Sequence, residues 1–203
     1  GDQMTRRVVV TGMGAITPLG HNVRDTWEGL SAGKSGTGPI TLFDATGGDA
    51  RVAGEVKEFD PAHYMDRKDA RRSDRFTQFA VAAARMAEAD SGLDVSRAPE
   101  RMGASIATAQ GGVASLAECC AGAPSGRIMP TLVTAFMPNM GAGWVSIELG
   151  LRGPVTAPCT ACVECRSCAT CRAPVAPDRT HAARPMPKSA PETSKWDMPR
   201  QAC

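Results

Sequence analysis

Hydrophobic and polar positions follow two kinds of pattern from the start of the chain to Ala157. Short apolar runs, typical of buried strands, occur at Arg7–Thr11, Met102–Ala107 and Pro154–Ala157. Between them, apolar residues recur every three or four positions, as they do on one face of a helix. Because strands and helices alternate along the chain, we expect an α/β fold with a parallel or mixed sheet and helices packed on it.

Four helices are predicted from the periodic runs. The first is capped by Asn22 and ends at Gly33, and the second runs from Ser73 to Asp90. Two more follow Gly111-Gly112 and Pro138-Asn139. The apolar faces expected for the four are Val23, Trp27 and Leu30; Phe76, Phe79, Ala80, Ala83 and Met86; Val113, Leu116 and Ala117; and Met140, Trp144 and Ile147.

The composition changes abruptly after Cys162. All 21 glycines and every Ile, Leu, Phe and Tyr lie before this residue, whereas the last 41 residues, 163–203, contain six of the 15 prolines. Such a segment cannot bury enough apolar surface to offset the entropy of ordering it, so we expect it to be irregular. We therefore divide the chain into a domain of residues 4–162 and a non-homologous tail of 163–203, rich in Pro, Cys and Arg. A shifted reading frame at the Cys162 codon is our hypothesis for this tail.

Charge and hydropathy narrow the class of protein. The net charge of +2 is too small for a typical nucleic-acid-binding protein, and the sequence holds no apolar run of the roughly 18 residues that a membrane span needs. The N-terminus shows no signal-peptide pattern, so we expect a reducing, cytoplasmic location without structural disulfides. We expect no nucleic acid or membrane among its partners.

Eight cysteines include a series at every third position, Cys159 to Cys171. The spacing fits neither an iron–sulfur loop nor a tetrahedral zinc knuckle well, so we expect no metal and no cofactor. A metal-binding tail stays an alternative. Cys162 differs from the others because it directly follows a predicted strand. A thiol at the start of a helix there would have a lowered pKa and act as a nucleophile, although a small buried side chain is an equally good interpretation.

Two further motifs have ordinary alternatives. Gly12-Met13-Gly14 follows a strand but lacks the helix that a dinucleotide fingerprint opens, so we favour glycines that allow tight packing. The run Arg67–Arg75 places five cations in nine positions. It is either solvated surface or a docking patch for an acidic partner.

Taken together, these residues resemble the N-terminal half of a β-ketoacyl-acyl-carrier-protein synthase, a condensing enzyme of fatty-acid or polyketide chain elongation. The resemblance extends from about Arg6 to Cys162. It is carried by Arg7–Gly14, Thr17–Gly20, Thr26-Trp27, Phe43-Asp44, Arg67–Asp74, Ser91–Leu93, Gly111-Gly112, Pro138–Met140, Leu151–Pro154 and Thr160–Cys162.

The resemblance implies a thiolase-like fold, an α-β-α-β-α sandwich of which this chain supplies the first half. It implies that Cys162 accepts an acyl group from an acyl carrier protein and that a malonyl-loaded carrier is then decarboxylated and condensed with it. By the same resemblance, Lys68, Arg71 and Arg72 contact the acidic carrier protein, Gln110 borders the acyl pocket, and the chain forms a homodimer.

The sequence also departs from the family. Val163–Arg166 replace the small residues that follow the nucleophile in the family, and none of the three histidines matches a family motif. We therefore expect a truncated form with impaired condensation. The alternatives are a non-catalytic fragment that binds carrier protein or pairs in a dimer, and the metal-binding tail.

Overall fold

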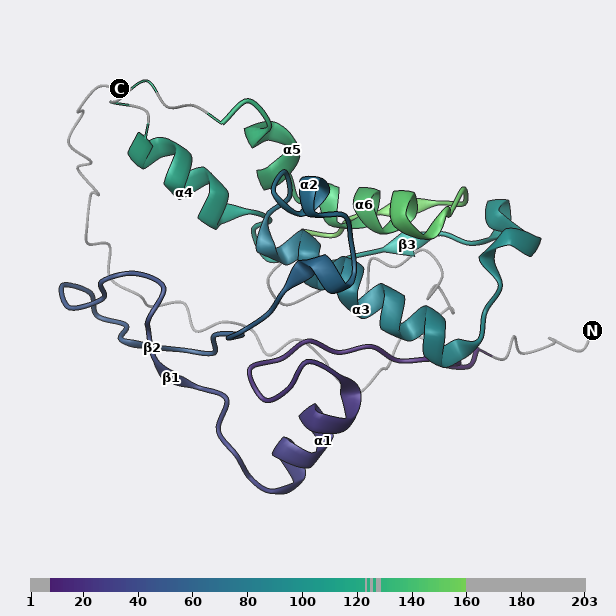
Figure 1. Ribbon diagram of the computed structural model, residues 1–203, viewed down its shortest axis with the longest axis horizontal. Coiled ribbons are helices and arrows are strands. Elements are labelled where there is room, and N and C mark those ends of the chain that lie inside the picture. Colours follow the sequence, from purple (N-terminus) through teal and green to yellow (C-terminus); the bar gives the residue numbers. More distant parts are fainter. Residues whose placement is uncertain (1–7, 123, 125, 127–128, 160–203) are drawn as a thin grey trace, which may run out of the picture. The chain divides into compact units, whose positions relative to one another are not determined.

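The computed structural model describes residues 8–122, 124, 126 and 129–159, which all lie in one unit of the chain, Gly1–Cys171. Cys162 and the predicted tail lie outside the described residues. The elements follow one another in the order α1 (Val23–Ser31), β1 (Gly38–Pro39), β2 (Val52–Ala53), η1 (Pro61–His63), α2 (Arg67–Ala70), α3 (Arg75–Ser91), η2 (Val95–Arg97), η3 (Pro99–Arg101), β3 (Ala104–Ser105), α4 (Val113–Gly122), α5 (Leu132–Phe136), α6 (Met140–Leu149) and β4 (Val155–Thr156) (Figure 1).

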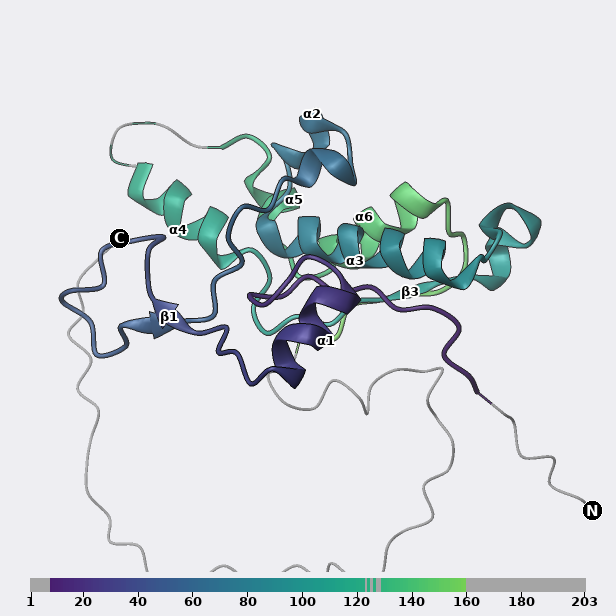
Figure 2. The same ribbon diagram turned by 60° about the horizontal axis from the view of Figure 1, so that its bottom comes forward.

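The core lies where α3 and α6 pack against each other. Val81 of α3 and Ala142 and Val145 of α6 are buried, and they meet Ala104 of β3. Small residues at the start of α6 allow this close approach, since a side chain on Gly141 would contact the Phe76 ring of α3. The two helices run side by side in both ribbon views (Figures 1 and 2).

The strands β3 and β4 form a short parallel pair beside α6. Ala104 pairs with Val155 and Ser105 with Thr156. The hydrogen bonding continues past the strands, because the amide of Thr108 donates to the carbonyl oxygen of Pro158 at 3.1 Å. The predicted strands at these two places are confirmed, although they are shorter than the apolar runs suggested, and their parallel pairing agrees with the expected parallel or mixed sheet.

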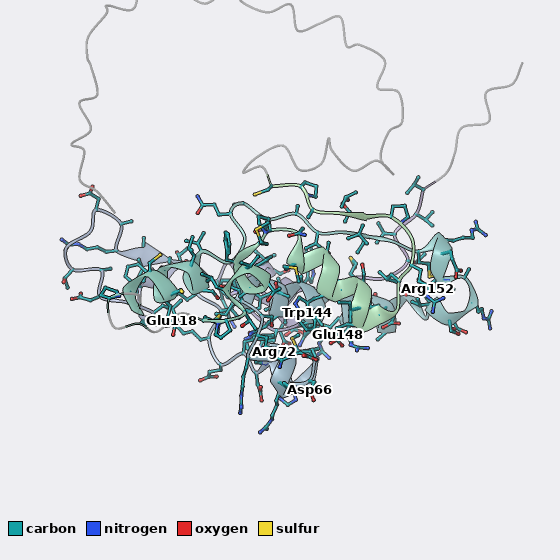
Figure 3. All side chains as sticks on the ribbon, turned by 90° about the horizontal axis from the view of Figure 1, so that it is seen from above. Asp66, Arg72, Glu118, Trp144, Glu148 and Arg152 are labelled. Atoms are coloured by element: carbon teal, nitrogen blue, oxygen red, sulfur yellow. The ribbon has the colours of Figure 1, made fainter. Side chains whose placement is uncertain are left out.

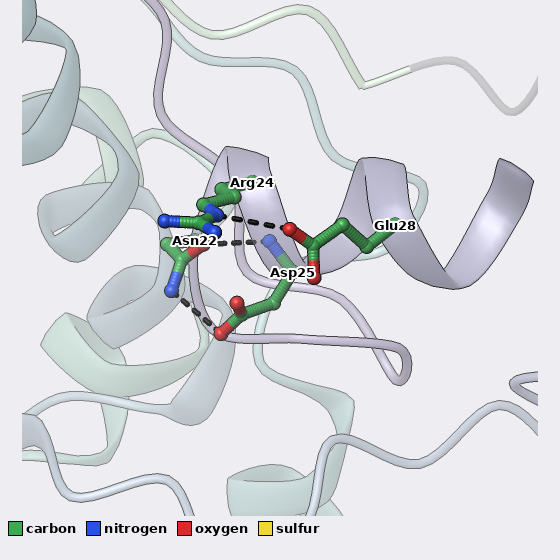
Figure 4. A network of polar contacts seen from close by, with 4 residues as sticks. All are labelled: Asn22, Arg24, Asp25 and Glu28. Carbon is green, nitrogen blue, oxygen red and sulfur yellow. Dashed lines mark hydrogen bonds and ion pairs between the residues drawn. The ribbon is translucent and has the colours of Figure 1, made fainter.

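The first predicted helix forms with the predicted cap. Asn22 Oδ1 accepts a hydrogen bond of 2.8 Å from the Asp25 amide, and Asn22 Nδ2 donates to Asp25 Oδ2 at 2.7 Å (Figure 4). Arg24 and Glu28, one helical turn apart, form an exposed ion pair of 2.9 Å. The helix therefore begins where local side-chain chemistry satisfies its free amides.

The predicted strand at Arg7–Thr11 is wrong for the part that the structure describes. Val8, Val9 and Val10 are 83%, 58% and 83% exposed, and no backbone hydrogen bond joins them to another described residue. A strand exists only through its neighbours, and the sheet next to α6 ends at β3 within the described residues. The apolar run alone could not supply a partner.

The segment after these valines packs directly on α3 instead. A Cβ on Gly12 would overlap the carbonyl oxygen of Ala87, and one on Gly14 would overlap that of Ala83. Between the two glycines, the Met13 amide donates to Asp90 Oδ2 at 2.9 Å. The preference for a packing role over a dinucleotide fingerprint thus has a direct steric basis.

Three predicted apolar faces hold only in part. Trp27 and Leu30 of α1 are 69% and 57% exposed, and Val113 of α4 is 44% exposed. In α6, Ile147 is 69% exposed, whereas Trp144 is partly buried and packs against the core as predicted. In α6 the buried positions are small residues, Gly141, Ala142, Val145 and Ser146. Large apolar residues indicate a buried face only when a neighbouring element covers them, and here α3 covers the small-residue face.

Candidate functional site

The predicted docking residues lie on and immediately after the short helix α2. Asp66 caps this helix by accepting a hydrogen bond of 2.7 Å from the Lys68 amide. Lys68, Arg71 and Arg72, which we call the basic patch, are all exposed. None of the ion pairs between described residues involves them. The patch therefore presents three positive charges to solvent, and no carboxylate of the described residues pairs with them; Figure 3 labels Arg72 and Asp66.

The backbone beneath the basic patch is fixed by buried contacts. Met65, Ala70 and Ser73 are each less than a tenth exposed. The carbonyl oxygen of Ala70 accepts hydrogen bonds from Ser73 Oγ at 3.2 Å and from Gln78 Nε2 at 2.9 Å. The three charged side chains thus extend from a short segment that is anchored on both sides.

Arg75, the last cation of the sequence run, is half-buried and packs against other parts of the chain. Its Nη2 donates to the carbonyl oxygen of Val56 at 2.7 Å, and its guanidinium lies 5.0 Å from the centre of the Phe79 ring. Both contacts are with neighbouring parts of the same chain. The run of five cations therefore contains at least two kinds of residue, which spacing alone could not separate.

The parallel pair of strands leads toward the predicted nucleophile. The ladder carries the chain to Cys159, which is exposed and whose Sγ lies 3.4 Å from the carbonyl oxygen of Ala109. Cys162 is three residues further on and lies outside the described residues. Its predicted role stays a prediction.

Gln110 lies in the turn between β3 and α4 and is exposed. The turn is tightly held on both sides of it. The Gly111 amide donates to Thr108 Oγ1 at 3.1 Å, and the Gly112 amide donates to the carbonyl oxygen of Phe136 at 3.0 Å. Gly111 has a φ of 71°, a left-handed conformation that favours glycine. The predicted pocket role of Gln110 stays a prediction.

A buried polar junction next to the basic patch was not predicted from the sequence. Asp74 is 7% exposed and caps α3, with Oδ1 accepting from the Phe76 amide at 3.2 Å. Its Oδ2 accepts from the Ser115 amide at 3.0 Å and from Ser115 Oγ at 2.6 Å. The cap of α3 could have been predicted, because an acidic residue precedes an apolar periodic run. The contact with α4, 41 residues further along, could not.

A separate polar cavity of about 490 Å³ lies between α1, the β1–β2 hairpin and the turn at Thr17–Gly20. Glu55 at its wall accepts hydrogen bonds from Thr41 Oγ1 at 2.6 Å, from the Thr41 amide at 2.9 Å and from the Leu42 amide at 3.2 Å. These donors, led by the Thr41 hydroxyl, hold the pKa of Glu55 below its usual value.

Metal and membrane sites receive no support from the described part of the chain. Within it, no group of three or more His, Cys, Asp or Glu side chains is arranged to hold a metal ion. Likewise, no helix of the described residues combines the length and the hydropathy needed to cross a bilayer. The cysteines from Cys162 onward, on which the alternative of a metal-binding tail depends, lie outside this part.

Comparisons with known proteins cover the same part of the chain. Residues 5–163 match the family described as beta-ketoacyl synthase, N-terminal domain. The 3-oxoacyl-[acyl-carrier-protein] synthase 2 of Synechocystis sp. is 42% identical over 162 residues, which are 77% of this chain and 39% of that protein. The enzyme of the same name from Coxiella burnetii has the same identity and the same coverage. The chain thus spans about two fifths of the length of the curated relatives it matches.

Solved structures agree with this result. The ishigamide ketosynthase/chain length factor has a TM-score of 0.67 at 30% identity, over 76% of this chain and 40% of that chain. A beta-ketoacyl synthase from Burkholderia phymatum STM815 has a TM-score of 0.64 at 26% identity, over 79% and 41%. A type II PKS ketosynthase in complex with its acyl-carrier protein has a TM-score of 0.55 at 25% identity, over 72% and 40%. The predicted α/β, thiolase-like fold is confirmed.

Proposed function

The chain belongs to the β-ketoacyl synthase family, and on that premise we propose that it accepts an acyl group from an acyl carrier protein onto the thiol of Cys162. The observation that carries the proposal is the basic patch, because three exposed cations that pair with no carboxylate of the described residues fit an acidic carrier. The similarity to a type II PKS ketosynthase in complex with its acyl-carrier protein supports the same partner.

The proposed step is a thioester exchange. The Cys162 thiolate attacks the carbonyl carbon of the acyl thioester, so a new carbon–sulfur bond forms to Cys162. The carbon–sulfur bond to the carrier breaks, and the carrier leaves as a thiol after taking up a proton. Lys68, Arg71 and Arg72 hold the carrier by charge, and Gln110 borders the acyl chain.

We propose further that the 203-residue chain does not complete the condensation. Decarboxylation of a malonyl thioester develops negative charge, which needs positioned donors such as histidines. The two described histidines make other contacts. The His21 ring packs edge-on against Phe59, with 6.0 Å between the ring centres, and His63 Nε2 lies 3.9 Å from the Asp60 carboxylate. The third, His181, lies in the tail outside the described residues. The family's catalytic histidines have no match among the three.

The test is acylation measured by intact-protein mass spectrometry, with an acyl-loaded carrier protein as donor. We expect one acyl adduct on the parent chain and on the matched control Cys159→Ser, which removes an exposed neighbouring thiol. Cys162→Ser should form none. An adduct of undiminished amount in Cys162→Ser would contradict the proposal. With malonyl-loaded carrier added, we expect no detectable 3-oxoacyl product, and robust product would refute the proposed loss of condensation.

A second candidate function is carrier binding or dimer pairing without chemistry, and the basic patch also favours it. Replacing Lys68, Arg71 and Arg72 together with Ala should weaken carrier binding by roughly tenfold or more. A control with the same change in charge replaces Arg24, Arg97 and Arg152, which are exposed elsewhere. Carrier binding without any adduct on the parent chain would favour this second function over the first.

Two other proposals need separate measurements. The homodimer implied by the family resemblance predicts twice the chain mass in light scattering, and a monomer at all concentrations would contradict it. The alternative of a metal-binding tail predicts stoichiometric zinc or iron in the purified protein, and metal-free protein that keeps its fold would contradict that alternative.

A further inference from the structure

We propose that Asp74 is a positioning residue that fixes the turn carrying Gln110 and so sets the acyl-chain preference of the site. The part that concerns acyl chains rests on the proposed function; the part that concerns the turn does not. The starting observation is that the two oxygens of one buried carboxylate serve two different helices.

The first oxygen of Asp74 has a local role. Oδ1 accepts from the Phe76 amide and thereby caps α3, as an acidic residue does at many helix starts. This single contact satisfies the needs of α3. The burial of Asp74 is therefore not explained by its own helix.

The second oxygen reaches the start of α4. Oδ2 accepts from both the amide and the hydroxyl of Ser115, the third residue of α4. The carboxylate thus acts as an N-cap supplied from another part of the chain. Its negative charge lies beside the positive ends of two helix dipoles, which favours this arrangement.

The turn before α4 is held between this junction and the strand pair. On one side, Thr108 is bound to Pro158 by the parallel ladder. On the other side, a Cβ on Gly112 would lie 2.9 Å from the Asp74 Cβ and 2.6 Å from the carbonyl oxygen of Ala135. The backbone of Gly112 is therefore confined against Asp74, and Gln110 lies between the two fixed ends.

The basic patch is close to this junction along the chain but chemically separate from it. Arg72 precedes Asp74 by two residues and is exposed, whereas Asp74 is buried. A substitution at Asp74 should alter the turn that carries Gln110. Carrier binding should be unchanged as long as the backbone beneath the basic patch stays in place. This separation makes the proposal testable against a general loss of folding.

The experiment uses Ser115→Ala and Asp74→Asn in the full chain, with Ser96→Ala as the matched control. Asp94 Oδ1 accepts from the amide and hydroxyl of Ser96 at 3.1 and 2.6 Å, so the control removes the same kind of bond away from the turn. Ser115→Ala keeps the cap of α3 and serves if Asp74→Asn fails to fold.

The first measurement is amide hydrogen exchange, which needs no activity. Loss of one such hydrogen bond should speed exchange at Gly111 and Gly112 by about fivefold in Ser115→Ala and more in Asp74→Asn. Ser96→Ala should leave these amides unchanged. Unchanged exchange in both test variants would overturn the proposal, whatever the chain does with acyl groups.

The second measurement is acyl preference, with a series of acyl-loaded carrier proteins of increasing chain length as probes. The ratio of the acylation rates for long and short chains should shift by about fivefold or more in Ser115→Ala, with carrier affinity unchanged. A purely structural role would lower all rates together and would overturn the proposed control of preference. If the parent chain is not acylated by any probe, the proposed function fails and the exchange result alone decides the positioning.

Discussion

The helix pair α3–α6 and the N-terminal region, residues 8–58, arise from equally clear sequence signals but differ in what they bury. Val81, Ala142 and Val145 of the pair are at most 3% exposed, whereas Val8, Val10 and Trp27 of the N-terminal region are 69–83% exposed. Both regions have well-formed helix starts. The difference shows that capping is a local property, while burial depends on elements far away in the sequence.

The largest difference between the two regions is expected when a valine of each is replaced by alanine. Val81→Ala leaves a cavity between α3 and α6 and should lower the free energy of unfolding by about 2 kcal/mol. Val10→Ala removes the same atoms from an exposed side chain and should change it by less than about 0.5 kcal/mol. Urea denaturation followed by circular dichroism measures both. Equal losses would mean that Val10 is buried in solution and that the two regions do not differ.

A smaller effect is expected from removing the Asn22 cap of α1 in the N-terminal region. Asn22→Ala removes the side-chain acceptor for the Asp25 amide and should destabilise α1 by about 1 kcal/mol. Because Trp27 and Leu30 are exposed, we expect α1 to fray without loosening α3. Hydrogen exchange of both helices checks this. Faster exchange in α3 would show that the two regions fold as one unit.

The smallest effect concerns the charge of Glu55 at the β1–β2 hairpin. Thr41→Val removes the hydroxyl donor that contributes most to the lowered pKa of Glu55, so this pKa should rise toward its ordinary value. A carboxyl whose folded pKa is lowered stabilises the fold above its unfolded pKa, and the contribution is lost as the pH falls through the folded value. The hairpin of the parent chain should therefore loosen only at acid pH.

The measurement is an NMR titration of the Glu55 carboxyl carbon. Thr46→Val is the matched control, since the Thr46 hydroxyl makes the equivalent bond of 2.7 Å to Asp44 and holds down the pKa of that residue instead. The control should leave Glu55 unchanged. An unaltered Glu55 titration in Thr41→Val would show that the hydroxyl is not its main partner.

The parts of the fold that depend on local chemistry were predictable. Asn22 marked the start of α1, and the second predicted helix agrees with α3 to within two residues. The strand predicted at Arg7–Thr11 is wrong, because Val8–Val10 have the residue types of a strand but no hydrogen-bonded partner strand among the described residues. The short helices α2 and α5 have too few residues to show a periodic pattern.

In the candidate site, too, local features were predictable and contacts between distant segments were not. Lys68, Arg71 and Arg72 are exposed as predicted, because a dense run of charge is a local property. Arg75 donates to the carbonyl oxygen of Val56, 19 residues away, and Asp74 accepts from Ser115, 41 residues away. Residue spacing along the sequence could not predict either contact. The roles of Cys162 and Gln110 came from the family resemblance and stay predictions.

The close contact of Gly12 and Gly14 with α3 has a consequence for variation of this sequence. Since any Cβ at these two positions would overlap a helix carbonyl, a saturation library should retain only glycine at both. Met13 between them is 56% exposed and offers mainly its backbone amide to Asp90, so it should accept most residues. The surviving variants would then share a Gly-x-Gly signature created by helix packing, which a motif search would mistake for a nucleotide site.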